Sequence, residues 1–202
     1  APTRTTTKPH QPPDHHHPPT MPAPTTLTLL LLLTALNTIL ACHHLRPRDT
    51  TFAWDSIKTL KAMAPIPPQP CQHQQAPFPF PDTLLHNTHP QQAAATAQHI
   101  LEKLFAILSA QSTPHHWDDQ ARHRLLNNLH HYIHHLERCL PANRMLIKRQ
   151  GPHNLMLTIN KYFRRIHNFL HAHNHSACAW DHVRLEVRAS FQRVDTLIRQ
   201  MK

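Results

Sequence analysis

The sequence predicts an all-α fold, a bundle of five helices, because glycine is scarce and proline is unevenly placed. The 202 residues include 20 prolines but a single glycine, Gly151. A sheet protein with tight turns needs several residues that take positive φ easily, so one glycine disfavours that class. Prolines are absent from 91–113, 115–140 and 153–202. Since proline inside a helix costs about 3 kcal/mol or more, these three stretches are the ones free to be helical.

Residues 1–41 are expected to be a leader and not part of the fold. A leucine-rich run over 27–41 is shorter than the roughly 20 residues that span a bilayer, which favours a signal peptide over a permanent anchor. The segment before this run is rich in proline and histidine, and such low-complexity sequence cannot build a core. We therefore expect a secreted protein with one folded domain over 42–202 and no permanent membrane insertion.

Four cysteines follow the leader, Cys42, Cys71, Cys139 and Cys178. An even number of cysteines after an export signal predicts disulfides, because the chain enters an oxidising compartment. Two disulfides are expected. Four cysteines allow three pairings, and the residues alone do not choose among them.

The first helix is predicted to begin near Asp49 or Thr50 and to end near Met63. Its spacing of apolar residues places Trp54 and Ile57 on the buried face.

The next segment, 65–90, is too rich in proline for regular structure and is predicted to be a long crossover loop. Such a connection lets two neighbouring helices run parallel, which is typical of the up-up-down-down bundle of helical cytokines.

The other four helices are predicted over about 91–110, 118–140, 153–173 and 178–201. In each, apolar residues recur at spacings of three and four and form one buried stripe. The predicted inward residues are Ala94, Ala97, Leu101, Leu104 and Leu108; Leu125, Leu129, Tyr132, Leu136 and Cys139; Leu155, Ile159, Tyr162, Ile166 and Phe169; and Trp180, Val183, Val187, Phe191, Val194, Ile198 and Met201.

The charge balance is basic, with 21 Lys and Arg against 11 Asp and Glu, which suits an acidic partner. Nucleic acid is disfavoured as that partner, because the chain has no basic run of five, no RNA-binding aromatic motif and no zinc-finger spacing. An enzyme is also disfavoured. The chain carries neither a G-x-S-x-G nor a glycine-rich phosphate motif, so we expect no catalytic residue and no cofactor.

Histidines are abundant, 23 in all, and His130, His131, His134 and His135 form two pairs at i, i+4 on the third predicted helix. Such a pair can bind one metal, but a specific site needs a third or fourth ligand, and the glutamate of H-E-x-x-H is missing. We expect solvated histidines and no metal site. The alternative function is a secreted histidine-rich helical bundle that binds metal or an acidic glycan. The triplet that begins at Asn174 is a candidate N-glycosylation site between two helices.

The C-terminal third carries the most specific pattern. Residues 178–191 read CAWDHVRLEVRASF, which resembles the type I interferon signature C-A-W-E-x-V-R-x-E-I-x-x-S-F. Residues 162–170, YFRRIHNFL, are similar to the stretch that precedes this signature in the family. The start CHHLRP at 42–47 and FPFP at 78–81 extend the resemblance. The start and the histidine-rich third helix look most like bird members, of an interferon-beta-like subtype.

The resemblance implies the disulfides Cys42–Cys139 and Cys71–Cys178. It also implies a monomeric, secreted cytokine without enzymatic chemistry. Members of the family bridge two chains of the type I interferon (interferon-alpha/beta) receptor on the cell surface and so induce an antiviral response.

The same resemblance places two receptor surfaces. For the high-affinity chain, the family uses the first loop and the outward face of the last helix, and the residues at matching positions here are Arg184, Arg188, Ala189, Gln192 and Arg193. Glutamine and histidine at 72–75 stand where the family often has a basic anchor in that loop. For the low-affinity chain, the matching positions on the second to fourth helices are Ala106, His130, Asn160 and Lys161.

Overall fold

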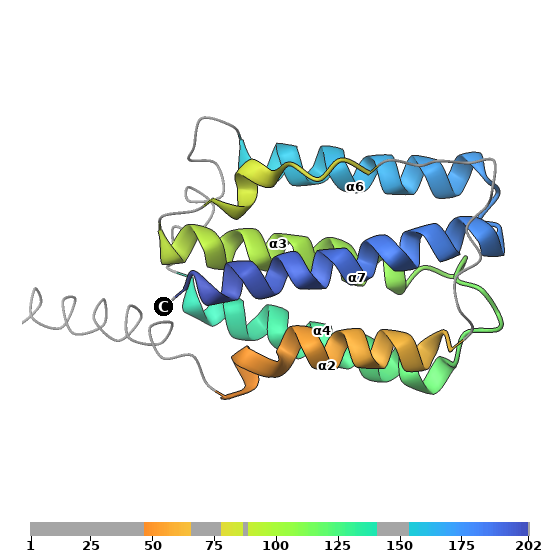
Figure 1. Ribbon diagram of the computed structural model, residues 1–202, viewed down its shortest axis with the longest axis horizontal. Coiled ribbons are helices and arrows are strands. Elements are labelled where there is room, and N and C mark those ends of the chain that lie inside the picture. Colours follow the sequence, from red (N-terminus) through yellow and green to blue (C-terminus); the bar gives the residue numbers. More distant parts are fainter. Residues whose placement is uncertain (1–46, 66–77, 87–88, 141–153, 202) are drawn as a thin grey trace, which may run out of the picture. The chain divides into compact units, whose positions relative to one another are not determined.

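The computed structural model describes residues 47–65, 78–86, 89–140 and 154–201, all within one compact unit, Ala35–Lys202. These residues form five α-helices and one 3-10 turn, and no strand occurs among them (Figure 1). The leader, Cys42, Cys71 and residues 72–75 lie outside the described ranges. The elements are α2 (Pro47–Met63), η1 (Asp82–Leu85), α3 (Pro90–Leu108), α4 (Asp119–Cys139), α6 (Leu155–Ala172) and α7 (Ala177–Arg199).

The five predicted helices are all present, with ends that differ by a few residues from those expected. Two helices begin with proline, α2 at Pro47 and α3 at Pro90, where the missing N–H costs nothing because no partner for it exists in the first turn. The prediction that the crossover lacks regular structure was wrong at η1, a single turn in which Leu84 is buried. One turn suffices there to bury an apolar side chain between prolines.

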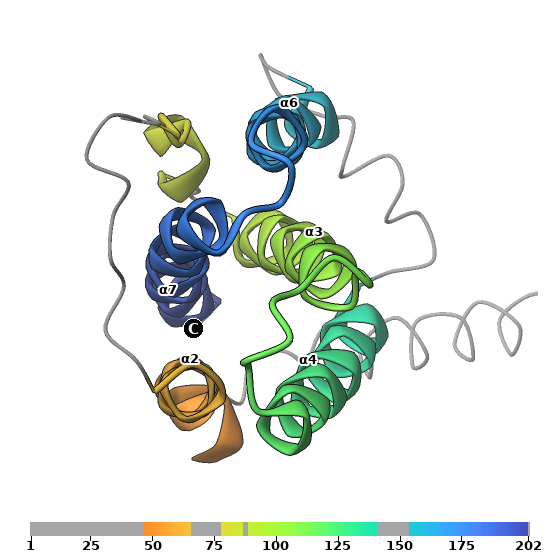
Figure 2. The same ribbon diagram turned by 90° about the vertical axis from the view of Figure 1, so that its right-hand side faces the viewer.

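Helix α7 packs against α2, α3 and α6, while α4 packs against α2 and α3 (Figure 2). Figure 1 shows α2 and α3 running in one direction and α4 and α7 in the other, with α6 parallel to α3. The contacts agree: the Asp118 N–H, which precedes α4, donates to the Met63 carbonyl at the end of α2 over 2.8 Å. The start of α4 therefore lies beside the end of α2, and the chain returns along α2 in the opposite direction.

The predicted buried stripes of α3, α4 and α7 are fully buried, and in α6 only Phe169 is partly exposed. Trp180 is the largest fully buried side chain and meets Trp117 edge to face, with ring centroids 5.3 Å apart. The prediction for Trp54 was wrong, because this side chain is 70% exposed on α2. Phe52 takes the inward place instead and stacks on Tyr132 at a centroid distance of 3.9 Å.

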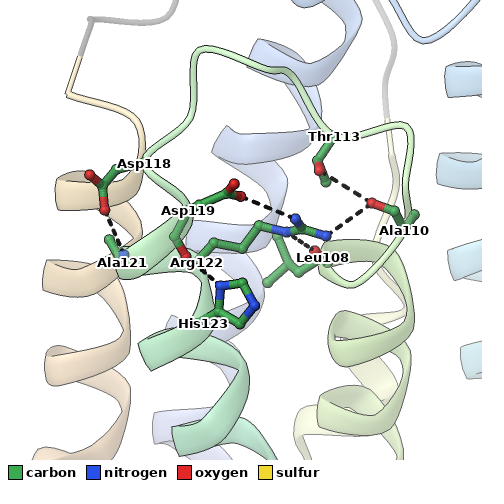
Figure 3. Close-up of polar contacts among 8 residues, drawn as sticks. All are labelled: Leu108, Ala110, Thr113, Asp118, Asp119, Ala121, Arg122 and His123. Atoms are coloured by element: carbon green, nitrogen blue, oxygen red, sulfur yellow. Dashed lines mark hydrogen bonds and ion pairs between the residues drawn. The ribbon is translucent and has the colours of Figure 1, made fainter.

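The turn between α3 and α4 is closed by side chains at both helix ends (Figure 3). Asp118 accepts the Ala121 N–H over 2.6 Å and so caps the start of α4. Arg122 reaches back to the end of α3, where its Nε donates to the Leu108 carbonyl over 3.0 Å and its Nη2 to the Ala110 carbonyl over 3.2 Å. The Leu108 carbonyl is the last of α3 and has no partner within that helix, while the Ala110 carbonyl, in the turn, also accepts from the Thr113 hydroxyl. One guanidinium therefore bonds both carbonyls.

We expect Arg122→Ala to lower the free energy of unfolding by roughly 1–3 kcal/mol, because two carbonyls lose a charged donor. Urea unfolding followed by circular dichroism measures this loss. Arg124→Ala is the matched control, since Arg124 is exposed on the same helix. Equal stability of the two variants would contradict the capping role.

Candidate functional site

The outward face of α7 is a continuous stripe of five exposed residues. Its members are Leu185, Arg188, Gln192, Thr196 and Arg199, spaced three or four apart, and half-buried Ala189 lies beside them. Because the opposite face is fully buried in the core, this stripe is the part of α7 that a partner can reach. Three of the predicted contact residues, Arg188, Ala189 and Gln192, belong to it.

The prediction that Arg184 faces outward was wrong. Its side chain is buried, with 7% exposure, and its Nη1 donates to the Ala64 carbonyl over 2.5 Å. Nη2 lies 3.5 Å from Asp181 Oδ1, so a carboxylate balances the buried charge. The periodicity of α7 places residue 184 next to Val183 and Val187 at the edge of the core, where a long side chain can turn inward.

Arg193 is half-buried and fully engaged within the protein, which differs from the predicted outward position. Its Nη1 donates to Glu186 Oε1 over 2.6 Å and to the Tyr162 hydroxyl over 3.1 Å. The guanidinium also lies 4.3 Å from the centroid of the Phe80 ring. Burial, together with hydrogen bonding to Glu186, raises the pKa of Tyr162 above its ordinary value, so the phenol stays a proton donor.

Two exposed apolar residues were missed from the sequence, Leu185 on α7 at 44% exposure and Trp54 on α2 at 70%. Leu185 could have been found, because it is three residues before Arg188 on the same helical stripe. Trp54 could have been found from the turn of α2 that places Phe52, Ser56 and Leu60 inside. Exposed aromatic and aliphatic side chains beside arginine are typical of binding surfaces.

The second predicted set lies over α3, α4 and α6. Ala106, His130 and Lys161 are exposed, and His130 is brought to α3 by a ring contact with Phe105 at 6.2 Å. Asn160 is half-buried, and its Oδ1 lies 3.0 Å from Nε2 of His99, a buried residue of α3. The structure thus joins His130 and Asn160 to α3, which carries Ala106, and Asn160 is partly occupied by this internal contact.

Ala106 and Asn160 also line a cleft of about 500 Å³ between α3 and α6. Its floor is apolar and includes Phe163 and Leu170. Its charged and titratable lining residues are Lys103, Arg164, His167 and His175, and none of the lining residues is acidic. This cleft therefore suits a ligand that combines an apolar group with negative charge.

The histidines of α4 pair with carboxylates and with each other. His134 lies 3.1 Å from Glu137, His135 lies 3.2 Å from the buried Asp49, and the rings of His130 and His134 are 4.4 Å apart. Within the described ranges, no three His, Cys, Asp or Glu side chains are arranged to hold a metal ion.

Where the structure describes the chain, no helix is long and apolar enough to cross a membrane.

The described cysteines and the candidate glycosylation triplet lie at or between helix ends. Cys139 ends α4 and Cys178 lies in the first turn of α7, and both are disulfide-bonded. Asn174 is exposed in the turn between α6 and α7 with a φ of 49°, a left-handed conformation that asparagine tolerates well. Ser176, the third residue of the triplet, caps α7 by accepting the Ala179 N–H over 3.3 Å.

Comparisons with known proteins agree with this architecture. Residues 45–201 match the family model for the interferon alpha/beta domain. Interferon type B of Gallus gallus is 54% identical over 170 residues, 84% of each chain, and an interferon of Meleagris gallopavo is 48% identical over 170 residues, 84% of this chain and 88% of the relative.

Among solved structures, zebrafish interferon 1 has a TM-score of 0.61 at 20% identity and covers 77% of this chain and 97% of its own, which shows the shared fold. Together, the family match over most of the chain and the high identity to bird relatives show that this chain is a type I interferon of the bird branch of the family.

Proposed function

We propose that this interferon is exported by its leader and bridges two chains of the type I interferon receptor, and that this bridging starts the antiviral response. The family consists of cytokines and not of enzymes. The observation that carries the proposal is the exposed stripe of α7, which presents Leu185, Arg188 and Gln192 on a helix whose other face is locked in the core. A metal-binding or glycan-binding bundle finds no support in the comparisons.

The high-affinity chain is proposed to bind the α7 stripe at Leu185, Arg188, Ala189 and Gln192. Arg188 is exposed there, and its planar guanidinium can donate paired hydrogen bonds to a carboxylate of the partner. Leu185 beside it offers apolar area to the centre of such an interface. Arg184 and Arg193 are not part of this proposed surface, because Arg184 is buried and Arg193 is paired with Glu186.

We expect Arg188→Glu to weaken binding to the high-affinity chain by about tenfold or more, because an attractive charge becomes a repulsive one. Surface plasmon resonance with the immobilised receptor chain measures this. In cells of the host, the wild type should fire an interferon-response promoter only when the receptor is present, and Arg188→Glu should need a higher dose. Arg124→Glu, on the exposed side of α4, is the control. Unchanged affinity and potency of Arg188→Glu would remove α7 as the site.

The low-affinity chain is proposed to bind over α3, α4 and α6 at Ala106, His130, Asn160 and Lys161. The cleft beside Ala106 supports this, since its apolar floor and cationic lining fit a receptor segment with an apolar side chain next to carboxylates. The exposed Lys161 on α6 adds positive charge on the same helix.

Filling the cleft by Ala106→Trp should weaken binding to the low-affinity chain by roughly fivefold to fiftyfold, while binding to the high-affinity chain stays unchanged. Ala106 is exposed, so the larger side chain does not disturb the core. Signalling should fall with the affinity. Ala172→Trp, at an exposed alanine near the end of α6, controls for the added aromatic area. If Ala106→Trp binds both chains as the wild type does, the cleft is not used.

The disulfides are proposed to pair Cys42 with Cys139 and Cys71 with Cys178 within an up-up-down-down arrangement of α2, α3, α4 and α7. The bonded state of Cys139 and Cys178 supports the use of two bridges. Each bridge would join a cysteine from earlier in the chain to a helix end, at Cys139 of α4 or Cys178 of α7. Asn174 is proposed to carry a glycan, which its exposed turn can accommodate.

Peptide mapping without reduction should recover the two linked peptides Cys42–Cys139 and Cys71–Cys178. Loss of one bridge should reduce stability by roughly 4 to 5 kcal/mol in the chain-entropy model, because each closes a loop of about 100 residues. Recovery of a Cys42–Cys71 peptide would contradict the pairing.

A further inference from the structure

Helix α7 holds the crossover between α2 and α3 at three points. Arg184 donates to the carbonyl of Ala64, one residue after α2 ends. Arg193 places its guanidinium 4.3 Å from the ring centroid of Phe80, and Gln200, just past the end of α7, donates from Nε2 to the Leu85 carbonyl over 2.5 Å. All three contacts are made by side chains of α7 or of Gln200, the residue that caps α7.

The three contacts follow the same order along α7 and along the described residues of the crossover. Arg184, Arg193 and Gln200 follow one another along α7, and their partners Ala64, Phe80 and Leu85 follow one another in the same order along the chain. At a rise of 1.5 Å per residue, the outer two contacts are separated by about 24 Å of helix. The ends of the crossover are therefore fastened to points more than four turns apart on the helix that carries the exposed stripe.

The hydrogen bond from Arg184 to the Ala64 carbonyl is buried. Arg184 is 7% exposed and is balanced by Asp181, while the neighbouring Met63 carbonyl accepts the Asp118 N–H. The last carbonyls of α2 thus gain donors from α7 and from the turn before α4. A charged donor in a buried position makes a strong hydrogen bond, and its loss leaves the carbonyl without a partner.

The contact at Phe80 belongs to a cluster of four side chains, which are Phe80, Tyr162, Glu186 and Arg193. Phe80 meets the Tyr162 ring edge to face at 5.1 Å, and Arg193 lies over Phe80 while it donates to Glu186 and to Tyr162. The Tyr162 hydroxyl donates to Glu186 as well. One carboxylate therefore fixes the guanidinium and the phenol together, and the two planar groups fix the Phe80 ring.

We propose that Arg184, Arg193 and Gln200 are positioning residues that hold the crossover in place beside the α7 stripe before any receptor binds. The inference rests on the proposed function, in which the high-affinity chain contacts α7. Exposed crossover residues such as Asp82 and Thr83 then extend the α7 surface. Because they are already ordered, receptor binding does not have to pay the conformational entropy of ordering them. The arginines act through the crossover and touch no partner themselves.

The test is a double-mutant cycle between Arg193→Met and Phe80→Leu, read as affinity for each receptor chain. Met keeps the unbranched length of Arg but removes the charge and the planar group. Each single variant should bind the high-affinity chain about tenfold more weakly, and the double variant should be no worse than either, because both remove one contact. Affinity for the low-affinity chain should not change.

Arg188→Met is the matched control, since it makes the same chemical change on the exposed side of the same helix. Its effect should add to that of Phe80→Leu. Arg193→Lys, which keeps the charge near Glu186 but not the planar group, should recover part of the affinity. In the unbound protein, amide exchange at residues 82–86 should accelerate in Arg193→Met while exchange within α7 stays as in the wild type.

Three results would overturn the inference. They are wild-type affinity of Arg193→Met, additive effects of Arg193→Met and Phe80→Leu, or an equal loss of affinity for both receptor chains, which would show general damage to the fold. Failure of the proposed function is a different result, because wild-type protein would then bind neither chain. In that event the exchange at 82–86 still decides whether Arg193 positions the crossover.

Discussion

The burial of one face of α7 is the constraint on which the rest of the structure depends. Trp180 and Phe191 are fully buried on this face, and the helix contacts α2, α3, α6 and η1. Burial of this apolar face along a helix of 23 residues is favourable only in one rotation of α7 about its own axis, and that rotation is therefore fixed. Its opposite stripe is thereby fixed as a surface. Of the arginines on α7, Arg188 lies in solvent, whereas Arg184 and Arg193 turn inward to partners within the protein.

The crossover needs α7 for a related reason. Its prolines cannot donate backbone hydrogen bonds. In the part of the crossover that the structure describes, the turn η1 has only four residues and so forms few hydrogen bonds of its own. Side chains from α7 supply the missing partners at Ala64 and Leu85 and a stacking partner at Phe80. The same helix therefore completes the core, anchors the irregular connection and offers the exposed stripe.

Much of the fold could be predicted from the sequence, because the spacing of apolar residues and the placing of proline report helices directly. The buried stripes of α3, α4 and α7 follow from that spacing alone. The hydrophobicity of Trp54 alone misleads, because the buried face of α2 is set by Phe52, Ser56 and Leu60, and helical spacing from these residues turns Trp54 outward.

The site was harder to predict for a physical reason. Arginine has a long apolar stem and a charged end, so at the edge of a core it can turn to solvent or reach inward. Arg188 remains exposed, whereas Arg184 donates to a carbonyl past the end of α2, and Arg193 donates to Glu186 of its own helix and to Tyr162 of α6. Such partners lie more than a hundred residues away in the case of Ala64, and helical periodicity carries no information about them. The resemblance points to the last helix, and the contacts decide which of the residues on that helix are exposed to a partner.

The central claim is that the exposed stripe of α7, centred on Arg188, meets the high-affinity receptor chain while the buried arginines do not. Photo-crosslinking tests it most directly, with a photoreactive amino acid introduced at position 188 or, as control, at the exposed position 124 of α4. With both receptor chains present, position 188 should give a covalent product with the high-affinity chain alone, and position 124 should give none with that chain. A product between position 188 and the low-affinity chain, or no product from position 188 under conditions in which the protein binds, would contradict the account.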